Sequence, residues 1–308
     1  MTIRFDDQVA IVTGAGAGLG RDYALALAER GAKVVVNDLA TIERADGSRI
    51  SAAQSVADEI VQRGGEAIAS RDSVATPETA AAIVEAAIAQ WGRVDVLINN
   101  AGILRDSSFA KAQLSDIQDV IGVHLLGTLY LTHACWPHMI SQGYGRIVVA
   151  TSMVGYTGNF GQTAYGSAKL GVVGMMKTLA IEGLRKGVLI NAISPAAVTQ
   201  MSKGLNPPAL EKYMTAEKVV PALIYLASRA NEQTAMTIEA MAGGFGRVEF
   251  FENTLVGYGP ASEVTPEMVA EKWAEVIDMG KASEVRHGPA DRPIDHIKAH
   301  ALWEEDAN

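Results

Sequence analysis

The chain has 308 residues, of which 48 % are hydrophobic and 20 % are charged, as in an ordinary globular protein long enough for one large or two ordinary domains. Its formal net charge of −9 offers no basic stripe to a phosphate backbone, so we expect no nucleic-acid partner. No stretch approaches the about 18 uninterrupted apolar residues of a transmembrane helix, so we expect no membrane span.

The chain ends and the single cysteine bear on cellular location. Residues 1–7 contain no apolar segment of a secretory signal, and the last three residues do not form a peroxisomal or retention address. Cys135 has no partner for an internal disulfide, which fits a reducing compartment. We therefore expect a cytoplasmic protein. His296 and His300 are spaced for a shared metal, but no third ligand is patterned nearby, so we expect no metal site.

A glycine-rich turn follows the first expected strand, Val9–Thr13, and leads into an alanine- and leucine-rich segment that predicts a helix up to Arg30. Such a turn lets a pyrophosphate approach the backbone, and the helix N-terminus favours its negative charge. Glycine spacing alone also fits a merely flexible turn. The candidate dinucleotide site in this turn comprises Gly14, Gly16, Gly18, Leu19 and Gly20.

An acid ends the second expected strand. Lys33–Asn37 is a buried-strand pattern, and Asp38 follows it directly. An acid at this place accepts hydrogen bonds from the ribose hydroxyls and repels a 2′-phosphate, which predicts NAD as the cofactor. The alternative is an ordinary turn aspartate. Arg44 and Arg49 follow nearby and keep NADP as an open alternative.

After a polar insertion at residues 40–50, strand and helix patterns alternate along the chain. This alternation predicts an α/β fold, a doubly wound parallel sheet with helices on both faces. Asp72 and Ser73 follow the third strand, and Asn100, Ala101 and Gly102 follow the fourth, at the sheet edge where ligands bind. Expected helices cover residues 52–63, 76–91, 115–141, 162–186 and 215–228, and further strands cover residues 66–70, 94–98, 146–150, 188–191 and 237–242.

The tail of the chain, residues 245–308, is expected to be a C-terminal helical extension. A helix is expected after Thr265, which can cap it, with Pro266 in its first turn. A second helical pattern covers residues 293–304. Residues 1–244 would then form one Rossmann catalytic domain, and the extension would pack on the same domain or on a neighbouring subunit.

Residues 151–169 contain a possible proton-transfer device. If a helix begins near Gln162, Tyr165 and Lys169 lie one turn apart on the same face. The lysine charge would then lower the tyrosine pKa from its usual value of about 10. Ser152 could supply a hydroxyl to the same substrate oxygen. A Tyr-x-x-x-Lys pair also arises by chance, so the pair alone does not decide the function.

Taken together, these motifs resemble the short-chain dehydrogenase/reductase family over about residues 9–244. The resemblance implies a nicotinamide cofactor, Tyr165 as catalytic acid or base, Ser152 as the group that orients the substrate oxygen, and Lys169 as the residue that holds the ribose and lowers the Tyr165 pKa. Tyr165 and Lys169 thereby also count as cofactor contacts. The family pattern further assigns cofactor contacts to Pro195, Ala197, Val198 and Thr199.

A closer resemblance is to the (3R)-hydroxyacyl-CoA dehydrogenase units of the type 2 peroxisomal multifunctional enzymes. It is carried by residues 36–39, 100–106 and 158–162 and by the extension with Thr265. The resemblance implies a (3R)-3-hydroxyacyl-CoA as the small-molecule substrate. Nothing in the motifs excludes a steroid or another bulky alcohol without CoA, and a non-catalytic NAD(H)-binding scaffold is a third alternative.

One position departs from the usual family pattern. His124 stands where the family usually has a catalytic asparagine on its fourth helix. We include it among the candidate catalytic residues; it could hold the helix distortion and a water, or be a satisfied core histidine. The resemblance also implies a homodimer or homotetramer, with helices around residues 115–141 and 162–186 at the dimer face.

Overall fold

A buried parallel sheet organises the first part of the chain. The structure is a computed structural model that describes residues 2–43, 47–198, 208–253, 255–258, 263–280 and 282–285. It divides into two compact units, Met1–Arg247 and Val248–Asn308. The eight strands of the sheet in the first unit are β1 (Val9–Thr13), β2 (Lys33–Asn37), β5 (Glu66–Ser70), β6 (Val96–Asn99), β7 (Gly145–Ala150), β8 (Val188–Ala196), β9 (Thr237–Met241) and β10 (Gly244–Val248).

The order of these strands determines where a ligand can bind. The order is β10-β9-β8-β7-β6-β1-β2-β5, and every pair from β9 to β5 is parallel. Along the chain, β2 pairs with β1 and β5 pairs with β2, and β6 then pairs with the other side of β1. The loops after β1 and β6 therefore diverge and leave a crevice at the carboxyl ends of these strands. The predicted doubly wound sheet is confirmed.

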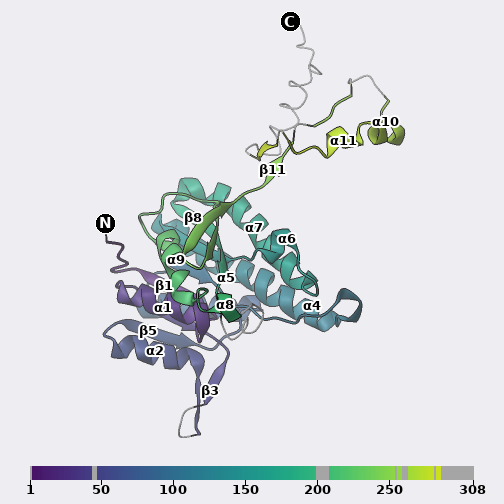
Figure 1. The fold of residues 1–308 in the computed structure, drawn as a ribbon. Coiled ribbons are helices and arrows are strands. Elements are labelled where there is room, and N and C mark those ends of the chain that lie inside the picture. The colour runs from purple at the N-terminus through teal and green to yellow at the C-terminus, as the bar shows by residue number, and fades with distance from the viewer. Residues whose placement is uncertain are drawn as a thin grey trace, which may run out of the picture. The chain divides into compact units, whose positions relative to one another are not determined.

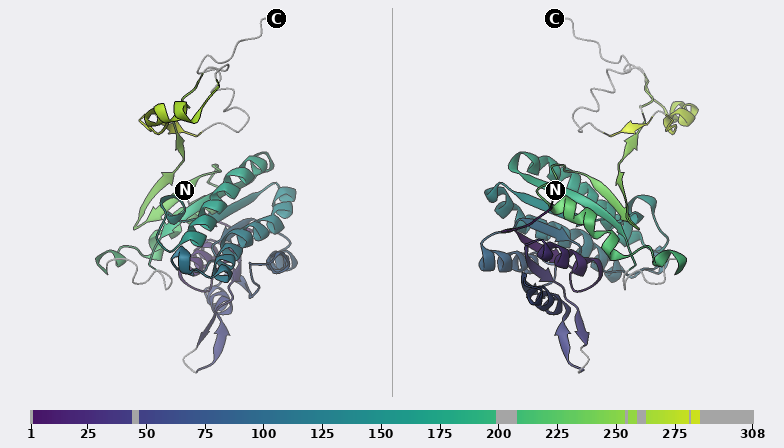
Figure 2. Two further views of the ribbon diagram at one scale, coloured as in Figure 1. Left: turned by 90° about the vertical axis from the view of Figure 1, so that its right-hand side faces the viewer. Right: turned by 60° about the vertical axis from the view of Figure 1, so that its left-hand side comes forward.

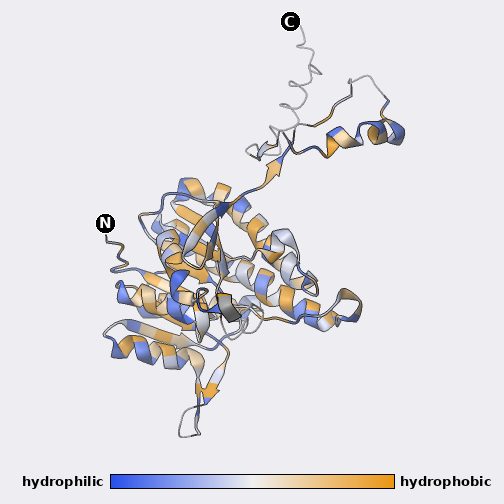
Figure 3. Ribbon diagram, viewed as in Figure 1, coloured by the Kyte–Doolittle hydropathy of each residue, from blue (hydrophilic) through white to orange (hydrophobic). Residues whose placement is uncertain are grey.

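Helices cover both faces of the sheet (Figures 1 and 2). Helices α1 (Gly18–Glu29), α2 (Ala52–Gln62) and α9 (Val220–Ala227) pack on one core, while α3 (Pro77–Trp91), α5 (Gly127–Gln142) and α7 (Thr163–Gly183) pack on the other. Alternate strand residues supply the two cores: Val12 lies in the first and Ile11 in the second. This alternation follows from the two-residue period of a strand. Hydrophilic and hydrophobic residues alternate around the covering helices (Figure 3).

The helix expected at residues 115–141 contains an irregular turn. It consists of α4 (Leu114–Ile121), a π-helical turn η2 (Gly122–Leu126) and α5. The π turn carries His124, whose side chain is buried. Pro137 lies inside α5. The predicted long helical segment is confirmed, but hydrophobic spacing does not reveal the single wide turn inside it.

Other differences concern short elements. The insertion at residues 40–50 is a hairpin of β3 (Thr41–Glu43) and β4 (Arg49–Ser51), and β10 continues the sheet beyond the expected domain boundary at residue 244. The helix expected at residues 215–228 is split. The remaining short helices of the first unit are η1 (Phe109–Lys111), α6 (Val154–Thr157), η3 (Leu184–Lys186), α8 (Pro208–Glu211) and η4 (Ala216–Lys218).

The second unit contains a small antiparallel pair and two short helices. The pair consists of β11 (Phe251–Glu252) and β12 (Ser283–Glu284), and the helices are α10 (Pro266–Glu271) and α11 (Trp273–Val276). The Thr265 hydroxyl accepts a hydrogen bond from the Met268 amide at 3.4 Å, which confirms the predicted cap. The helix expected at 293–304, with His296 and His300, lies outside the described residues. Within the described ranges, no helix is long and apolar enough to cross a membrane.

Candidate active site

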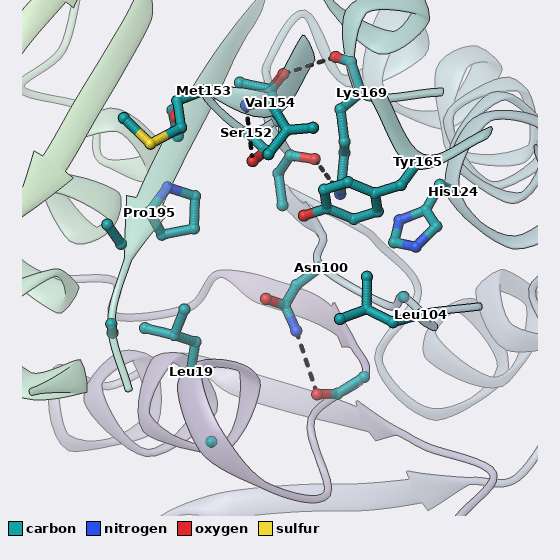
Figure 4. Close-up of a pocket in the computed structure, with 18 of the residues that line it drawn as sticks. Leu19, Asn100, Leu104, His124, Ser152, Met153, Val154, Tyr165, Lys169 and Pro195 are labelled. Atoms are coloured by element: carbon teal, nitrogen blue, oxygen red, sulfur yellow. Dashed lines mark hydrogen bonds between the residues drawn. The ribbon is translucent and has the colours of Figure 1, made fainter. Parts of the chain in front are cut away.

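A cavity of about 640 Å³ lies at the carboxyl ends of the central strands, a size typical of small-molecule sites. Its lining contains residues from the carboxyl ends of four strands: Gly14 follows β1, Asn100 follows β6, Ser152 follows β7, and Pro195 is the second-last residue of β8. Figure 4 shows the Tyr165 hydroxyl projecting into the space between Asn100, Ser152 and Pro195. The sheet topology therefore unites the predicted glycine turn and the predicted proton-transfer residues in one cavity.

The glycine turn leaves no room for side chains at its closest approaches. Gly14 has φ +62°, and a Cβ on it would lie 2.8 Å from the Ala101 Cα. A Cβ on Gly20 would lie 2.1 Å from the Gly14 carbonyl oxygen. Helix α1 begins at Gly18 after Ala17, whose methyl group cannot cap the first N–H groups, so these remain available to an anion. The turn thus fits the pyrophosphate of a dinucleotide.

Thr13 and Asn100 hold this turn in place. The Asn100 side-chain amide donates to the carbonyl oxygens of Thr13 at 3.0 Å and Gly14 at 3.2 Å. The Thr13 hydroxyl accepts from the backbone amides of Asn100 at 3.0 Å and Ala101 at 3.1 Å. Asn100 and Ala101 therefore fix the end of β6 against the end of β1. Thr13 was expected as the last residue of the first strand, and its fixing of the turn was not anticipated from the sequence.

The carboxylate of Asp38 is held at the end of β2. It accepts hydrogen bonds from the backbone amides of Gly16 at 2.9 Å and Ala40 at 2.8 Å. Ala40 in turn accepts from the Ala52 amide at 2.9 Å, so the base of the β3–β4 hairpin lies beside this acid. The charge of Asp38 consequently sits at a defined place in the lining of the cavity.

Some predicted cofactor residues lie elsewhere. Asp72 packs at the end of β5, where its carboxylate accepts from the Ser70 hydroxyl at 3.0 Å and its carbonyl oxygen accepts from the Asn37 side chain at 2.9 Å. Thr199 lies outside the described residues. The predicted residues that line the cavity are Gly14, Gly18, Leu19, Gly20, Asp38, Asn100, Gly102, His124, Ser152, Tyr165, Lys169, Pro195 and Ala197. Those that do not are Gly16, Asp72, Ser73, Ala101 and Val198.

Helix α7 places Tyr165 and Lys169 one turn apart, as the sequence predicts. The Lys169 ammonium nitrogen lies 5.6 Å from the centroid of the Tyr165 ring and donates to the Ala150 carbonyl oxygen at 2.6 Å. Lys169 is only 5 % exposed, and this burial lowers its pKa to about 7. Its side chain can therefore gain and lose a proton near neutral pH.

The pKa of Tyr165 differs from the sequence-based expectation. Burial of the phenol raises this pKa, the Ser152 hydroxyl lowers it in part, and the charge of Asp106 raises it further. The expected lowering by Lys169 is therefore wrong for this structure, because desolvation of the hydroxyl outweighs the favourable contacts. The spacing of the two residues predicts their proximity but not their burial.

His124 lies against Tyr165. Its ring makes an edge-on contact with Tyr165, with centroids 5.1 Å apart and an interplanar angle of 89°. Its Nε2 lies 2.8 Å from the Ile103 carbonyl oxygen and 3.0 Å from the Ile103 amide nitrogen, while the buried Nδ1 has no partner among the described residues. Its Nε2 is therefore bonded to the loop after β6, and both alternatives for His124, support of the helix distortion with a water or a satisfied core position, stay predictions. Burial, with the charge of Lys169, lowers the His124 pKa to about 3.

The His124 pKa predicts how stability depends on pH. Below pH 6.5 the unfolded chain takes up a proton at His124 that the folded protein excludes down to about pH 3, so the free energy of unfolding falls by about 1.4 kcal/mol per pH unit from this group. In His124→Asn, the free energy of unfolding measured with urea should fall less steeply between pH 6.5 and pH 4, because this contribution is absent. His133→Asn, at an exposed position, should keep it. Parallel curves for wild type and His124→Asn would contradict the assignment.

Several residues of the cavity were not predicted. They lie at or after the ends of β1, β6, β7, β8 and β9, just before α7, or in or after α8, and only the register of β8 and β9 could have indicated those on the last two strands. They are Ala17, Leu104, Ala150, Thr151, Met153, Val154, Asn159, Gln162, Ser194, Ala196, Leu210, Met214, Glu239 and Met241. Among these, Gln162 donates to the Asp106 carboxylate at 2.8 Å and accepts from Asn159 at 2.9 Å, which joins two loops at the rim.

Comparisons with known proteins agree with this geometry. The family model for short chain dehydrogenases matches residues 8–209. Peroxisomal multifunctional enzyme type 2 of Drosophila melanogaster is 44 % identical over 92 % of this chain and 47 % of that protein. Its full-length structure superposes with a TM-score of 0.80 at 37 % identity, covering 97 % of this chain and 50 % of that one. The chain thus spans about half of that relative, and the resemblance to the type 2 enzymes is confirmed.

Two further relatives are closer in length. A short-chain type dehydrogenase/reductase of Mycobacterium tuberculosis is 43 % identical over 90 % of this chain and 96 % of that protein. The structure of a 7α-hydroxysteroid dehydrogenase complexed with NADH and 7-oxo glycochenodeoxycholic acid has a TM-score of 0.70 at 30 % identity, covering 78 % of this chain and 95 % of that one. From its sequence match, its sheet and its cavity, the chain belongs to the short-chain dehydrogenase family and is an oxidoreductase.

Proposed function

We propose that the protein is an NAD-dependent dehydrogenase that interconverts a (3R)-3-hydroxyacyl-CoA and the corresponding 3-ketoacyl-CoA. The observation that carries the chemistry is the single cavity lined by Ser152, Tyr165 and Lys169 together with the glycine turn. The substrate class is supported by the names of relatives, which include a peroxisomal hydratase-dehydrogenase-epimerase and a 3-oxoacyl-[acyl-carrier-protein] reductase.

In this proposal the residues of the chain handle the proton and the substrate oxygen. During oxidation Tyr165 first releases its own proton to solvent and then, as tyrosinate, takes the proton of the substrate hydroxyl; during reduction the protonated Tyr165 donates its proton to the substrate oxygen. Ser152, which lines the same cavity, donates a hydrogen bond to that oxygen. Lys169 exchanges a proton near neutral pH because its pKa is about 7. A bound nicotinamide accepts or supplies the hydride. The edge of His124 keeps the Tyr165 ring in place.

The choice of NAD rests on Asp38. A phosphate on the adenosine ribose would meet this fixed carboxylate, while ribose hydroxyls could donate to it. Asp38→Ala should lower kcat/KM with NAD about tenfold and raise the NADP/NAD ratio, because hydrogen bonds to a charged acceptor are lost along with the repulsion. Initial rates with both cofactors measure this ratio. Asp58→Ala, at a half-buried position of α2 outside the lining of the cavity, is the matched control, and a wild type that prefers NADP would refute the assignment.

A substrate panel tests the substrate class. NADH formation is measured with 3-hydroxyacyl-CoA thioesters of both configurations, steroids and simple secondary alcohols. Preferred turnover of the (3R)-thioesters supports the proposal. A bulky-alcohol dehydrogenase, the alternative favoured by the bile-acid complex of the 7α-hydroxysteroid relative, would turn over steroids without a CoA requirement. Tight NADH binding without any turnover would favour a scaffold.

Assembly and location stay predictions. A homodimer or homotetramer follows from the family resemblance, and light scattering of the purified protein would test it. The names of several relatives contain the word peroxisomal, whereas the location proposed for this chain is the cytoplasm. Imaging of the tagged protein in its native cell would decide between these locations.

A further inference from the structure

One wall of the cavity carries an acid that the chemistry described above does not use. Ser194 on β8 pairs in register with Glu239 on β9, so both side chains project to the same face of the sheet. The residues before and after Glu239 face the other side of the sheet: Ile238 packs against the core beneath α1, α2 and α9, and Ala240 belongs to that core. Glu239 and Ser194 both line the cavity. The alternation along β9 therefore directs the glutamate toward the substrate space.

A tyrosine completes this polar wall. The Tyr156 hydroxyl, on α6, donates to the Ser194 hydroxyl at 2.8 Å. Burial raises the pKa of Tyr156, the Ser194 hydroxyl lowers it in part, and the negative charge of Glu239 raises it further. Tyr156, Ser194 and Glu239 thus form one cluster, here called the β8–β9 wall.

Glu239 has no hydrogen-bond or ion-pair partner in the described part of the chain. The lining of the same cavity also contains large apolar side chains: Met153, Val154, Leu210, Met214 and Met241. A substrate that fills the cavity removes water from the carboxylate. An alkyl group placed there leaves the charge unpaired, which is costly, while an N–H or O–H group forms a charge-assisted hydrogen bond.

We propose that Glu239 is a specificity-determining residue that selects alcohols presenting an N–H or O–H donor to the β8–β9 wall over alcohols presenting an alkyl group there. The inference deepens the proposed dehydrogenase function and rests on it. For an acyl-CoA substrate, the amide N–H groups of the pantetheine arm are donors of this class. A protonated amine is the strongest donor, because it also pairs with the negative charge.

Two matched substrate pairs test the proposal through NADH formation. The first pair is the (3R)-3-hydroxybutyryl thioester of N-acetylcysteamine and of 2-sulfanylethyl acetate, in which oxygen replaces the N–H group. The second is 5-aminopentan-2-ol and hexan-2-ol, in which a methyl group replaces the amine. We expect the wild type to prefer the donor-bearing member by about tenfold to hundredfold in kcat/KM in at least one pair.

Variants identify the residue responsible. Glu239→Leu should abolish or reverse this preference by raising kcat/KM for the donor-free member and lowering it for the other. Glu239→Gln, which keeps an acceptor oxygen but loses the charge, should keep part of the preference. Glu232→Leu makes the same change at an exposed position and should keep all of it. Thermal unfolding verifies that each variant is folded.

The outcomes separate the two proposals. Equal kcat/KM for both members in the wild type, or an unchanged ratio in Glu239→Leu, overturns the role of Glu239 while the dehydrogenase function stands. Turnover of the simple alcohols but of no thioester overturns the acyl-CoA assignment, and the second pair still measures the effect of Glu239. Absence of turnover for all four compounds overturns both.

Discussion

Tyr165→Phe is expected to lower turnover by about 10²-fold to 10⁴-fold, the usual contribution of a positioned acid or base. The phenylalanine ring preserves the edge-on contact with His124 but cannot take the proton of the substrate hydroxyl. NADH binding, measured by fluorescence titration, should remain within about twofold because the glycine turn and Asp38 are untouched. The loss should appear in kcat with little change in cofactor affinity.

The control for this substitution is Tyr225→Phe, which makes the same change on the exposed side of α9. It should keep wild-type rates with every substrate. Substantial activity in Tyr165→Phe would contradict the proposed mechanism, because in that mechanism Tyr165 alone transfers the proton of the substrate hydroxyl. Activity lost together with NADH binding would instead point to a structural role for the tyrosine.

Gly20→Ala is expected to weaken NADH binding by at least about tenfold. The added Cβ would lie 2.1 Å from the Gly14 carbonyl oxygen and 2.6 Å from the Asn100 side chain, so the turn and helix α1 would have to separate. Overpacking of this kind typically costs about 1–3 kcal/mol, and the displaced turn is the part that approaches the pyrophosphate. Calorimetric titration with NADH and urea unfolding measure the two effects.

Gly174→Ala provides the matched control for the glycine substitution. Gly174 lies in α7 with ordinary helical geometry, and a Cβ added to it would meet no atom within 4 Å outside its own helix backbone and chain neighbours. Alanine favours helix by up to about 1 kcal/mol relative to glycine, so this variant should bind NADH normally and unfold at a slightly higher urea concentration. Equal NADH affinity in Gly20→Ala and Gly174→Ala would show that the turn does not approach the cofactor.

The sheet was predictable because its signals are local. Each strand is a short apolar run that can be recognised from the sequence alone. The glycine turn directly follows β1 and Asp38 directly follows β2, so the ends of these two strands also locate the expected cofactor contacts. The pair of Tyr165 and Lys169 was predictable for a similar reason, since one helical turn sets their separation. The structure also confirms that their helix starts directly after Gln162.

Other features depend on contacts between distant segments. The raised pKa of Tyr165 follows from burial by several elements, and no spacing within residues 151–169 contains that information. Glu239 was overlooked because its orientation depends on which face of β9 meets the cavity, and that is set by pairing with β8. The cofactor contact expected of Asp72 from its place after β5 stays a prediction, and in the structure its carboxylate accepts a hydrogen bond from the Ser70 hydroxyl.

The π turn at Gly122–Leu126 has a consequence for comparing this helix with others. A π turn contains one residue more than the α turn that it replaces. The spacing between buried positions before the turn and those after it is therefore one residue longer than in an uninterrupted α-helix. Leu131, Cys135 and Met139 nevertheless share a buried face after the turn. His124 lies within the π turn, and its ring contacts Tyr165. An alignment with an uninterrupted helix needs a one-residue gap here to match both buried faces.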